Sequence, residues 1–234
     1  MNNDLTYNTF LFCSNRRFTL SVVESNDLKI IYEEKEFLDS QSQSLELNKL
    51  DIFLNNNIYR VEKKIDSFIK DIYLILEIED FNTIQISIKN NNNENIFSSS
   101  SLAYSLNEAK ELCFKASNDK KIIHMIIDNY QIDKINYSKL PKNIKCNNFS
   151  LDLRFICLPN LLVKDLEKIL QKYQISIKQI LNNRYIESLF KDNNKNLYQK
   201  AKEVTEGFNE NEVKLQKKTN ENQGFFERFF NYFS

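Results

Sequence analysis

Residues that could carry out chemistry are few in this sequence and widely spaced. His124 is the only histidine, and it lies in an apolar run without a serine, cysteine or metal-ligand pattern beside it. Such a histidine matches neither a catalytic triad nor a zinc site, so we expect a structural role. No C-x-x-C pair occurs, which predicts buried thiols in a reducing compartment for Cys13, Cys113, Cys146 and Cys157. We therefore expect no catalytic residue and no metal site.

Glycine is too scarce to build a loop that cradles phosphates. Such loops need residues with positive φ or close backbone approach to the ligand, and glycine supplies both at low cost. The sequence has only Gly207 and Gly224, and neither follows an expected strand. We therefore expect no nucleotide cofactor. Arg16 and Arg17 could contact phosphate, but a solvated position is commoner for charged residues in a turn between strands.

Composition indicates a protein without a strong overall electrostatic field. Lys plus Arg and Asp plus Glu number 32 each, so the formal net charge is zero and we expect no nucleic-acid partner. The 234 residues have room for one main domain with extensions. No charged n-region precedes an apolar h-region, and no run of about 18 apolar residues occurs. We therefore expect neither a signal peptide nor a membrane span, and any membrane contact must be local.

Apolar runs and alternating patterns predict strands in two parts of the chain. Continuous runs near the N-terminus predict a short meander. Further along, strict alternation of apolar and polar residues indicates half-buried strands, of which Ile84, Ile86 and Ile88 give the clearest case. The predicted strands are residues 10–12, 18–23, 28–32, 84–88, 121–127, 149–157 and 175–181.

Apolar residues at steps of three and four predict helices that cover these strands. One stripe runs from Ile58 to Ile72, a second helix begins at the S-x-x-E pattern of Ser105, and a third follows Asn160. This order predicts an α+β fold containing a compact two-layer α/β domain. The expected parts are degenerate strands over 1–46, the α/β domain over 47–190, a flexible polar linker over 191–223 that starts with a frayed helix, and an amphipathic helix over 224–234.

Five phenylalanines near the C-terminus fall on one face of the expected helix. They recur at steps of one, three, one and three and are Phe225, Phe226, Phe229, Phe230 and Phe233. An exposed stripe of this kind needs a partner or a bilayer to cover it. A place in the folded core is the alternative, but a polar tether separates the stripe from the domain. We therefore predict that these five residues bind the membrane reversibly.

The middle of the chain resembles a known family. Residues 120–133, KKIIHMIIDNYQID, are similar to the stretch REIIHVIPQEYIVDG typical of the FtsA family of bacterial cell-division proteins. His124, Tyr130 and Asp133 fall in register, and the order of elements from Ile58 to Leu181 agrees. The resemblance implies the small insertion subdomain of an actin-like fold, which self-associates and recruits division proteins. It also implies that the C-terminal helix is a membrane anchor.

Two parts of the family pattern are missing. Its Asp-x-Gly-Ser-Ser phosphate loop would fall on residues 12–16, where the aspartate and glycine are absent, and nothing after Leu189 resembles its second phosphate loop. We therefore expect a non-catalytic, FtsA-like scaffold or adaptor on the cytoplasmic side of the inner membrane, with FtsZ or later division proteins as partners. The alternative is an interaction domain of a related actin-like system, such as pilus assembly, whose C-terminal helix docks on a protein.

Overall fold

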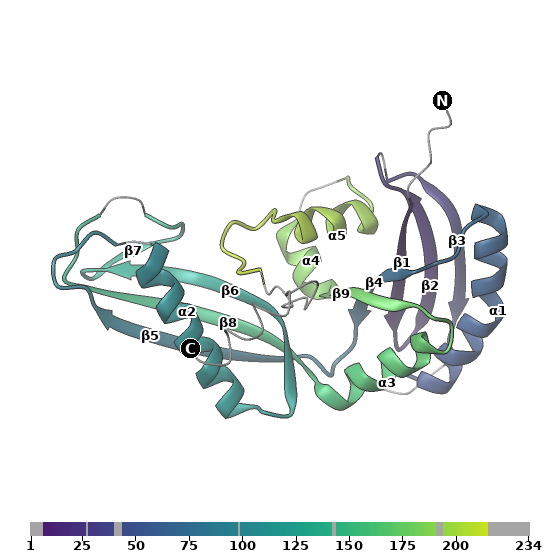
Figure 1. The fold of residues 1–234 in the computed structure, drawn as a ribbon, viewed down its shortest axis with the longest axis horizontal. Helices are drawn as coiled ribbons and strands as arrows, with labels where there is room; N and C mark the ends of the chain where they lie inside the picture. The colour runs from purple at the N-terminus through teal and green to yellow at the C-terminus, as the bar shows by residue number, and fades with distance from the viewer. Residues whose placement is uncertain are drawn as a thin grey trace, which may run out of the picture.

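Short runs of strands are separated by helices along the chain in the computed structural model, which describes residues 7–26, 28–39, 44–97, 99–141, 144–190 and 194–214 (Figure 1). The strands are β1 (Tyr7–Ser14), β2 (Arg17–Glu24), β3 (Ile30–Phe37), β4 (Asp71–Glu77), β5 (Asn82–Asn91), β6 (Lys120–Ile132), β7 (Ile135–Tyr137), β8 (Asn148–Pro159) and β9 (Ser176–Asn182). The helices are α1 (Leu47–Ile65), α2 (Ser99–Ala116), α3 (Asn160–Gln171), α4 (Asn183–Leu189) and α5 (Leu197–Glu206). This mixture confirms the predicted α+β class.

Sheet A, the five-stranded sheet, has the strand order β3-β2-β1-β4-β9. Strands β1, β2 and β3 follow one another through short connections and pair antiparallel. Strand β4 pairs parallel with β1, and β9 pairs parallel with β4. Parallel neighbours need long crossovers. Helix α1 lies in the first crossover, and the second contains α3 together with all strands of the other sheet.

The central strands of sheet A, β1, β2 and β4, are buried on both faces. Leu11 and Cys13 belong to one hydrophobic core, together with apolar residues of α1 and α3. Phe10 and Phe12, which alternate with them along β1, belong to a second core with residues of α4 and α5. Strands covered on both sides are apolar at nearly every position. This burial explains the continuous apolar runs of β1, β2 and β4.

Sheet B has four antiparallel strands in the order β5-β8-β6-β7, and α2 packs on one face of it. Ala109 and Cys113 of α2 are buried there. Helix α2 begins at Ser99, which corrects the predicted start at Ser105. Ser105 lies inside the helix, fully buried, and its hydroxyl accepts a hydrogen bond from Asn90 Nδ2 at 2.8 Å. The S-x-x-E pattern is therefore not a capping box.

Helix α1 ends earlier than its predicted stripe. After Ile65 the chain enters the left-handed region at Asp66, with φ of 51°, which breaks the helix. Phe68 is 81% exposed, and Ile72 belongs to β4, a strand that the sequence analysis missed. The stripe that faces the core begins about two turns before Ile58. Its apolar residues are Leu50, Phe53, Leu54, Ile58 and Val61.

The division of the sequence at residue 47 does not coincide with the division into sheets. Strands β1 to β3 share sheet A with β4 and β9, which come from residues 71–77 and 176–182. The N-terminal strands are therefore integral to the main core. Figure 1 shows sheet A with α1 at one end of the molecule and sheet B with α2 at the other.

The region expected to be a polar linker contains an ordered helix. Helix α5 starts with a capping box formed by Asn196 and Gln199 and ends at Gly207, whose φ is 97°. Its buried residues are Tyr198, Lys200, Ala201 and Val204. The prediction of a linker over 191–223 thus differs from the structure between residues 194 and 214, because this short apolar stripe covers sheet A.

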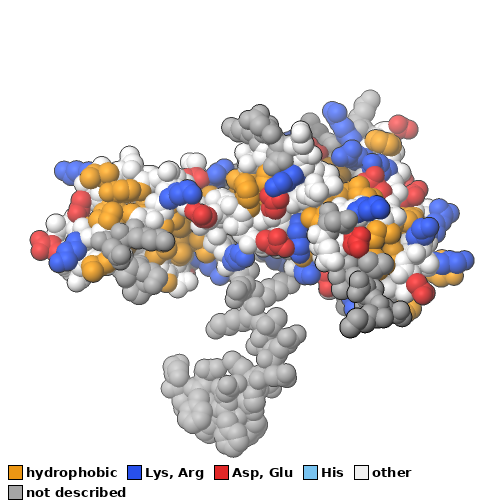
Figure 2. All heavy atoms as spheres, turned by 90° about the horizontal axis from the view of Figure 1, so that it is seen from above, with side chains coloured by type: hydrophobic (Ala, Val, Ile, Leu, Met, Phe, Trp, Pro, Cys, Tyr) orange, Lys and Arg blue, Asp and Glu red, His pale blue; other side chains and the backbone are white. Residues whose placement is uncertain are grey.

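The predicted membrane-binding phenylalanines, Phe225, Phe226, Phe229, Phe230 and Phe233, lie outside the described residues. Among the residues that are described, no helix is long and apolar enough to cross a membrane. Seen from above, the molecule shows hydrophobic side chains over both ends, with basic and acidic side chains interspersed (Figure 2). The described residues form no broad patch of one charge on this face (Figure 2).

Candidate functional site

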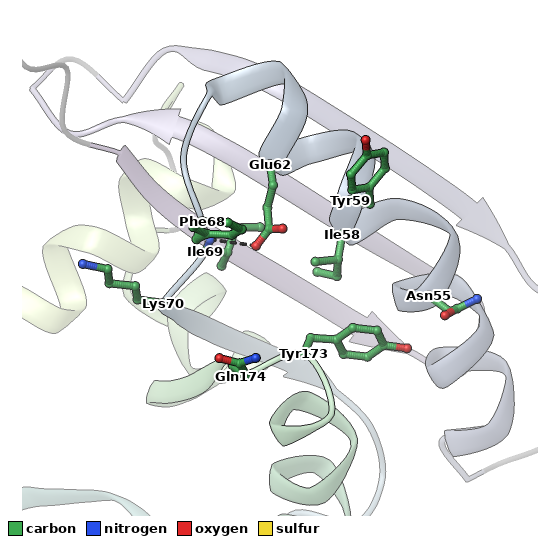
Figure 3. Close-up of a pocket in the computed structure, with 9 residues that line it drawn as sticks. All are labelled: Asn55, Ile58, Tyr59, Glu62, Phe68, Ile69, Lys70, Tyr173 and Gln174. Carbon is green, nitrogen blue, oxygen red and sulfur yellow. Dashed lines mark hydrogen bonds between the residues drawn. The ribbon is translucent and has the colours of Figure 1, made fainter.

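A cleft of about 580 Å³ opens beside the second half of α1 (Figure 3). Its volume lies within the range of roughly 300–1,000 Å³ that is usual for ligand pockets. Three segments form it, namely α1, the connection from α1 to β4, and the turn between α3 and β9. The residues that line it are Asn55, Ile58, Tyr59, Glu62, Phe68, Ile69, Lys70, Tyr173 and Gln174.

The cleft combines an apolar floor with an exposed aromatic rim. Ile58 and Ile69 are 6% and 5% exposed and belong to the core beneath it. Tyr59 and Phe68, in contrast, are 72% and 81% exposed. Exposed aromatic side chains beside an apolar depression are typical of protein interfaces, where rings provide large contact areas at low cost in conformational entropy.

Polar contacts hold the walls of the cleft in place. Asp51 joins α1 to the end of α3, because its carboxylate lies 2.6 Å from Lys172 Nζ and its backbone carbonyl accepts a hydrogen bond from the Tyr173 hydroxyl at 3.2 Å. Burial, followed by the charge and hydrogen bonding of Asp51, raises the pKa of Tyr173 to about 12. The Glu62 carboxylate accepts a hydrogen bond from the Ile69 N–H at 3.0 Å. The cleft is thus shaped before any ligand arrives.

The lining of the cleft contains few charged side chains. Its charged residues are Glu62 and Lys70, and Glu62 already accepts a backbone hydrogen bond. Neither a nucleophile paired with a base nor a group of metal ligands is present among the lining residues.

A second cluster links the two sheets around His124. The ring is 1% exposed, its Nδ1 lies 2.7 Å from Glu212 Oε1, and its Nε2 accepts a hydrogen bond from the Asn182 N–H at 3.1 Å. Because Nε2 is an acceptor, Nδ1 carries the hydrogen and donates it to Glu212. The other Glu212 oxygen accepts from the Tyr185 hydroxyl at 2.8 Å. Burial raises the pKa of Tyr185, so this hydroxyl stays protonated.

This junction cluster, defined as His124, Asn182, Tyr185 and Glu212, fastens the C-terminal part of the described chain to both sheets. His124 belongs to β6, Asn182 ends β9, and Glu212 follows α5. Glu212 forms a β-bridge with Ile126 of β6. Both ring nitrogens of His124 are occupied, so the histidine holds the structure together, as the sequence analysis expects, and has no free nitrogen for a substrate.

The structure accounts for the other residues that the sequence singles out. Ser14 occupies the turn where the phosphate loop of the FtsA family would lie, and its hydroxyl accepts hydrogen bonds from the N–H groups of Arg16 and Arg17 at 3.2 and 3.0 Å. All four cysteines are free and buried, as predicted. Burial, followed by the effect of Cys113, raises the pKa of Cys157 to about 12, which keeps its thiol protonated.

The aromatic rim of the cleft was not predicted. The sequence analysis assigned Phe68 to a buried helical stripe, because it lies three residues after Ile65 and one before Ile69. The polar pair Asp66 and Ser67 marks the end of the helix and is the signal that could have separated Phe68 from that stripe. Tyr59 sits on the exposed face of α1, which periodicity alone identifies as solvated.

Comparisons with known proteins give structural likeness only. No family model and no curated protein matches the sequence. The structure is similar to a PilM-PilN complex of type IV pilus biogenesis, with a TM-score of 0.47 and 6% identity over 77% of this chain and 48% of that one. It is also similar to the cytoplasmic domain of EpsL, an inner-membrane component of the type II secretion system of Vibrio cholerae, with a TM-score of 0.38 and 10% identity over 77% and 57%.

A third similar structure is a Bacteroides thetaiotaomicron protein described as having an actin-like ATPase fold and unknown function. Its TM-score is 0.35, with 13% identity over 78% of this chain and 55% of that one. The chain therefore spans about half the length of the three structures. All three TM-scores are below 0.5, and membership of the FtsA family is not shown.

Proposed function

We propose that this protein is a non-catalytic adaptor that binds a protein partner through the α1 cleft and attaches to the cytoplasmic face of the inner membrane through residues 225–233. The proposal of a protein partner rests on the cleft. It has a fixed apolar floor at Ile58 and Ile69 and a rim of two aromatic rings that are more than two-thirds exposed. Solvent-exposed rings in such a setting gain most when a partner covers them.

The phenylalanine stripe supports the membrane part of the proposal. Full burial of a large apolar side chain stabilises by roughly 1.5–3 kcal/mol, so half burial of five would give on the order of 5 kcal/mol before ordering costs. Part of this energy is spent on folding a short helix at the interface. The expected attachment is therefore reversible, and contact with a second partner would strengthen it.

We propose that the protein works in an actin-like assembly of the pilus or secretion type. No comparison supports a role in cell division. A division scaffold that binds FtsZ or later division proteins is the second candidate. The match of His124, Tyr130 and Asp133 to the FtsA pattern favours it. His124 holds the junction cluster and Tyr130 is buried, so these matches support a common fold more than a common partner.

Sedimentation with vesicles containing phosphatidylglycerol tests the membrane attachment. We expect the full chain to sediment with the vesicles and the Phe226→Glu, Phe230→Glu double variant to stay in the supernatant, because two charges on the apolar face oppose insertion. The matched control is Glu227→Gln with Asn231→Asp, which alters the opposite face and should preserve sedimentation. If the wild-type chain stays in the supernatant, the membrane part is wrong and the stripe docks on protein.

Photo-crosslinking in cells tests the protein-binding cleft. With p-benzoylphenylalanine in place of Phe68, we expect one discrete adduct larger than the protein, because the side chain at this position faces the partner. The same substitution at Phe114 is the control. Phe114 is also well exposed, at 61%, but it lies on α2, which packs on sheet B, whereas the cleft lies beside α1. The same adduct from both positions, or none from position 68, would contradict the proposal.

A further inference from the structure

The apolar surface around the α1 cleft extends beyond the residues that line it. Ile52 is 59% exposed and lies on the same face of α1 as Tyr59, seven residues later. Ile52, Tyr59 and Phe68 are thus three large apolar side chains that are all more than half exposed. Figure 3 shows Ile58 of the floor between Phe68 and the Tyr173 ring. Exposed apolar surface of this kind usually marks an interaction site.

The phenylalanine stripe of residues 225–233 has the spacing that suits such a groove. An amphipathic helix that docks in an apolar groove uses anchor residues at positions i, i+3, i+4 and i+7. Phe226, Phe229, Phe230 and Phe233 have this spacing. They lie outside the described residues, and the sequence predicts that they share one face of a helix. The stripe therefore offers large apolar side chains for the floor and rim of the cleft.

The charges on the two surfaces do not oppose this contact. One acidic and one basic residue, Glu62 and Lys70, line the cleft. Residues 225–233 also contain one of each, Glu227 and Arg228. Neither surface carries a net charge, so burial of apolar area is the main attraction. The contact should therefore persist at high salt, which screens charges but not apolar burial.

The chain between the fold and the stripe is long enough to cross from one face of sheet A to the other. Lys214, the last described residue, lies beside the end of α5, where its Nζ donates to the Glu206 carbonyl at 3.3 Å. Helices α5 and α1 cover opposite faces of sheet A, and helices placed in this way lie about 20 Å apart. The ten residues 215–224 span at most about 35 Å. Their reach exceeds the thickness to be crossed.

We propose that residues 225–233 of the same molecule occupy the α1 cleft when no membrane is present. Phenylalanine rings of the stripe pack on Ile58 and Ile69, and Tyr59 and Phe68 cover their sides. This inference rests on the proposed function, in which the same stripe binds the bilayer and the same cleft binds a partner. One stripe cannot do both at once, so the bilayer and the cleft compete for it.

The competition couples partner binding to membrane attachment. While the stripe fills the cleft, the apparent affinity for the partner falls in proportion to the fraction of molecules whose cleft is open. The tether favours this closed form, because a linked segment is present at a high effective concentration. Uptake of the stripe by the bilayer opens the cleft, so the partner binds at the membrane surface rather than in solution.

Photo-crosslinking of the purified full chain tests the contact. With p-benzoylphenylalanine in place of Phe68, we expect irradiation without vesicles to join position 68 to residues 225–233, which mass spectrometry of a digest identifies. The product keeps the mass of one chain. Vesicles containing phosphatidylglycerol should lower its yield, because they take up the stripe. The same substitution at Phe114 on α2 is the control and should give no bond to this segment.

Two variants of the segment complete the test. Phe226→Glu with Phe230→Glu should weaken docking at least about tenfold, because both charges oppose burial in an apolar cleft. Glu227→Gln with Asn231→Asp alters the opposite face and should leave the yield unchanged. Neither variant changes a residue of the cleft, so a loss of product reports on the stripe itself.

Three results would overturn the inference. They are the absence of a bond between position 68 and residues 225–233, a product with the mass of two chains, and a yield that stays constant while the protein sediments with vesicles. Failure of the membrane attachment gives a different result. A chain that forms the crosslink but does not sediment contradicts the attachment and supports the contact with the cleft, whereas a chain that sediments without forming it does the reverse.

Discussion

We expect Glu212→Ala to lower the free energy of unfolding by about 3 kcal/mol. The Glu212 side chain is 11% exposed and accepts hydrogen bonds from His124 Nδ1 at 2.7 Å and from the Tyr185 hydroxyl at 2.8 Å. Hydrogen bonds to a charged acceptor contribute roughly 1.5–3 kcal/mol each. Entry of water beside the truncated residue offsets part of the loss. Urea denaturation measures the change as a lower midpoint at unchanged slope.

Glu210→Ala is the matched control, since the same residue type lies two positions earlier. Its partner is Lys139 at 3.1 Å, and the two side chains are 72% and 76% exposed, so the expected loss is below about 0.5 kcal/mol. Glu212→Ala should also accelerate hydrogen exchange of the Ile127 amide, which donates to the Asn211 carbonyl at 2.9 Å. Equal stability losses in the two variants would contradict the role of Glu212 at the junction.

We expect Tyr198→Ala to lower the free energy of unfolding by about 4 kcal/mol. The Tyr198 ring is 6% exposed and packs against Phe10 with ring centroids 5.2 Å apart. Its hydroxyl lies 2.5 Å from Ser21 Oγ and donates to Glu33 at 2.9 Å. Truncation therefore opens a cavity on sheet A and removes polar contacts in the same place. Thermal unfolding followed by circular dichroism measures the loss.

Tyr198→Phe separates the ring from the hydroxyl. It keeps the packing against Phe10 and loses only the hydrogen bonds, while Ser21 still donates to Glu33 at 3.3 Å. The expected loss is about 1 kcal/mol. If the alanine and phenylalanine variants lose the same amount, the ring contributes no packing energy, and α5 is not part of the core of sheet A.

Strands β5 and β8 of sheet B were predictable because one face of this sheet is solvated, whereas the short β7 was missed. Ile84, Ile86 and Ile88 alternate with polar residues, and β5 occupies residues 82–91 around them. Strand β4 was missed for the opposite reason. It is buried on both faces, and its first apolar residue, Ile72, continues the spacing of the preceding helix, so periodicity could not separate strand from helix.

The order of strands in sheet A and the contacts of the candidate sites could not be predicted from local patterns. The bond between His124 and Glu212 joins residues 88 positions apart, and the bond from Tyr198 to Glu33 spans 165. Neither partner has a local signal, because an isolated Glu in a polar stretch usually indicates a solvated side chain. The single histidine was expected to be structural, but its partners depend on the crossover that brings β6 beside β9.

The short pairing of residues 211–213 with β6 also protects a sheet edge. Strand β6 pairs with β8 along its length, but on its other side β7 covers only residues 130–132. The Asn211 carbonyl and the Val213 N–H pair with Ile127 and Met125 of β6 at 2.9 and 2.8 Å. Unpaired strand edges invite pairing with another molecule and lead to aggregation. The segment after α5 thus acts against unwanted self-assembly of sheet B by occupying backbone groups that a second molecule would otherwise use.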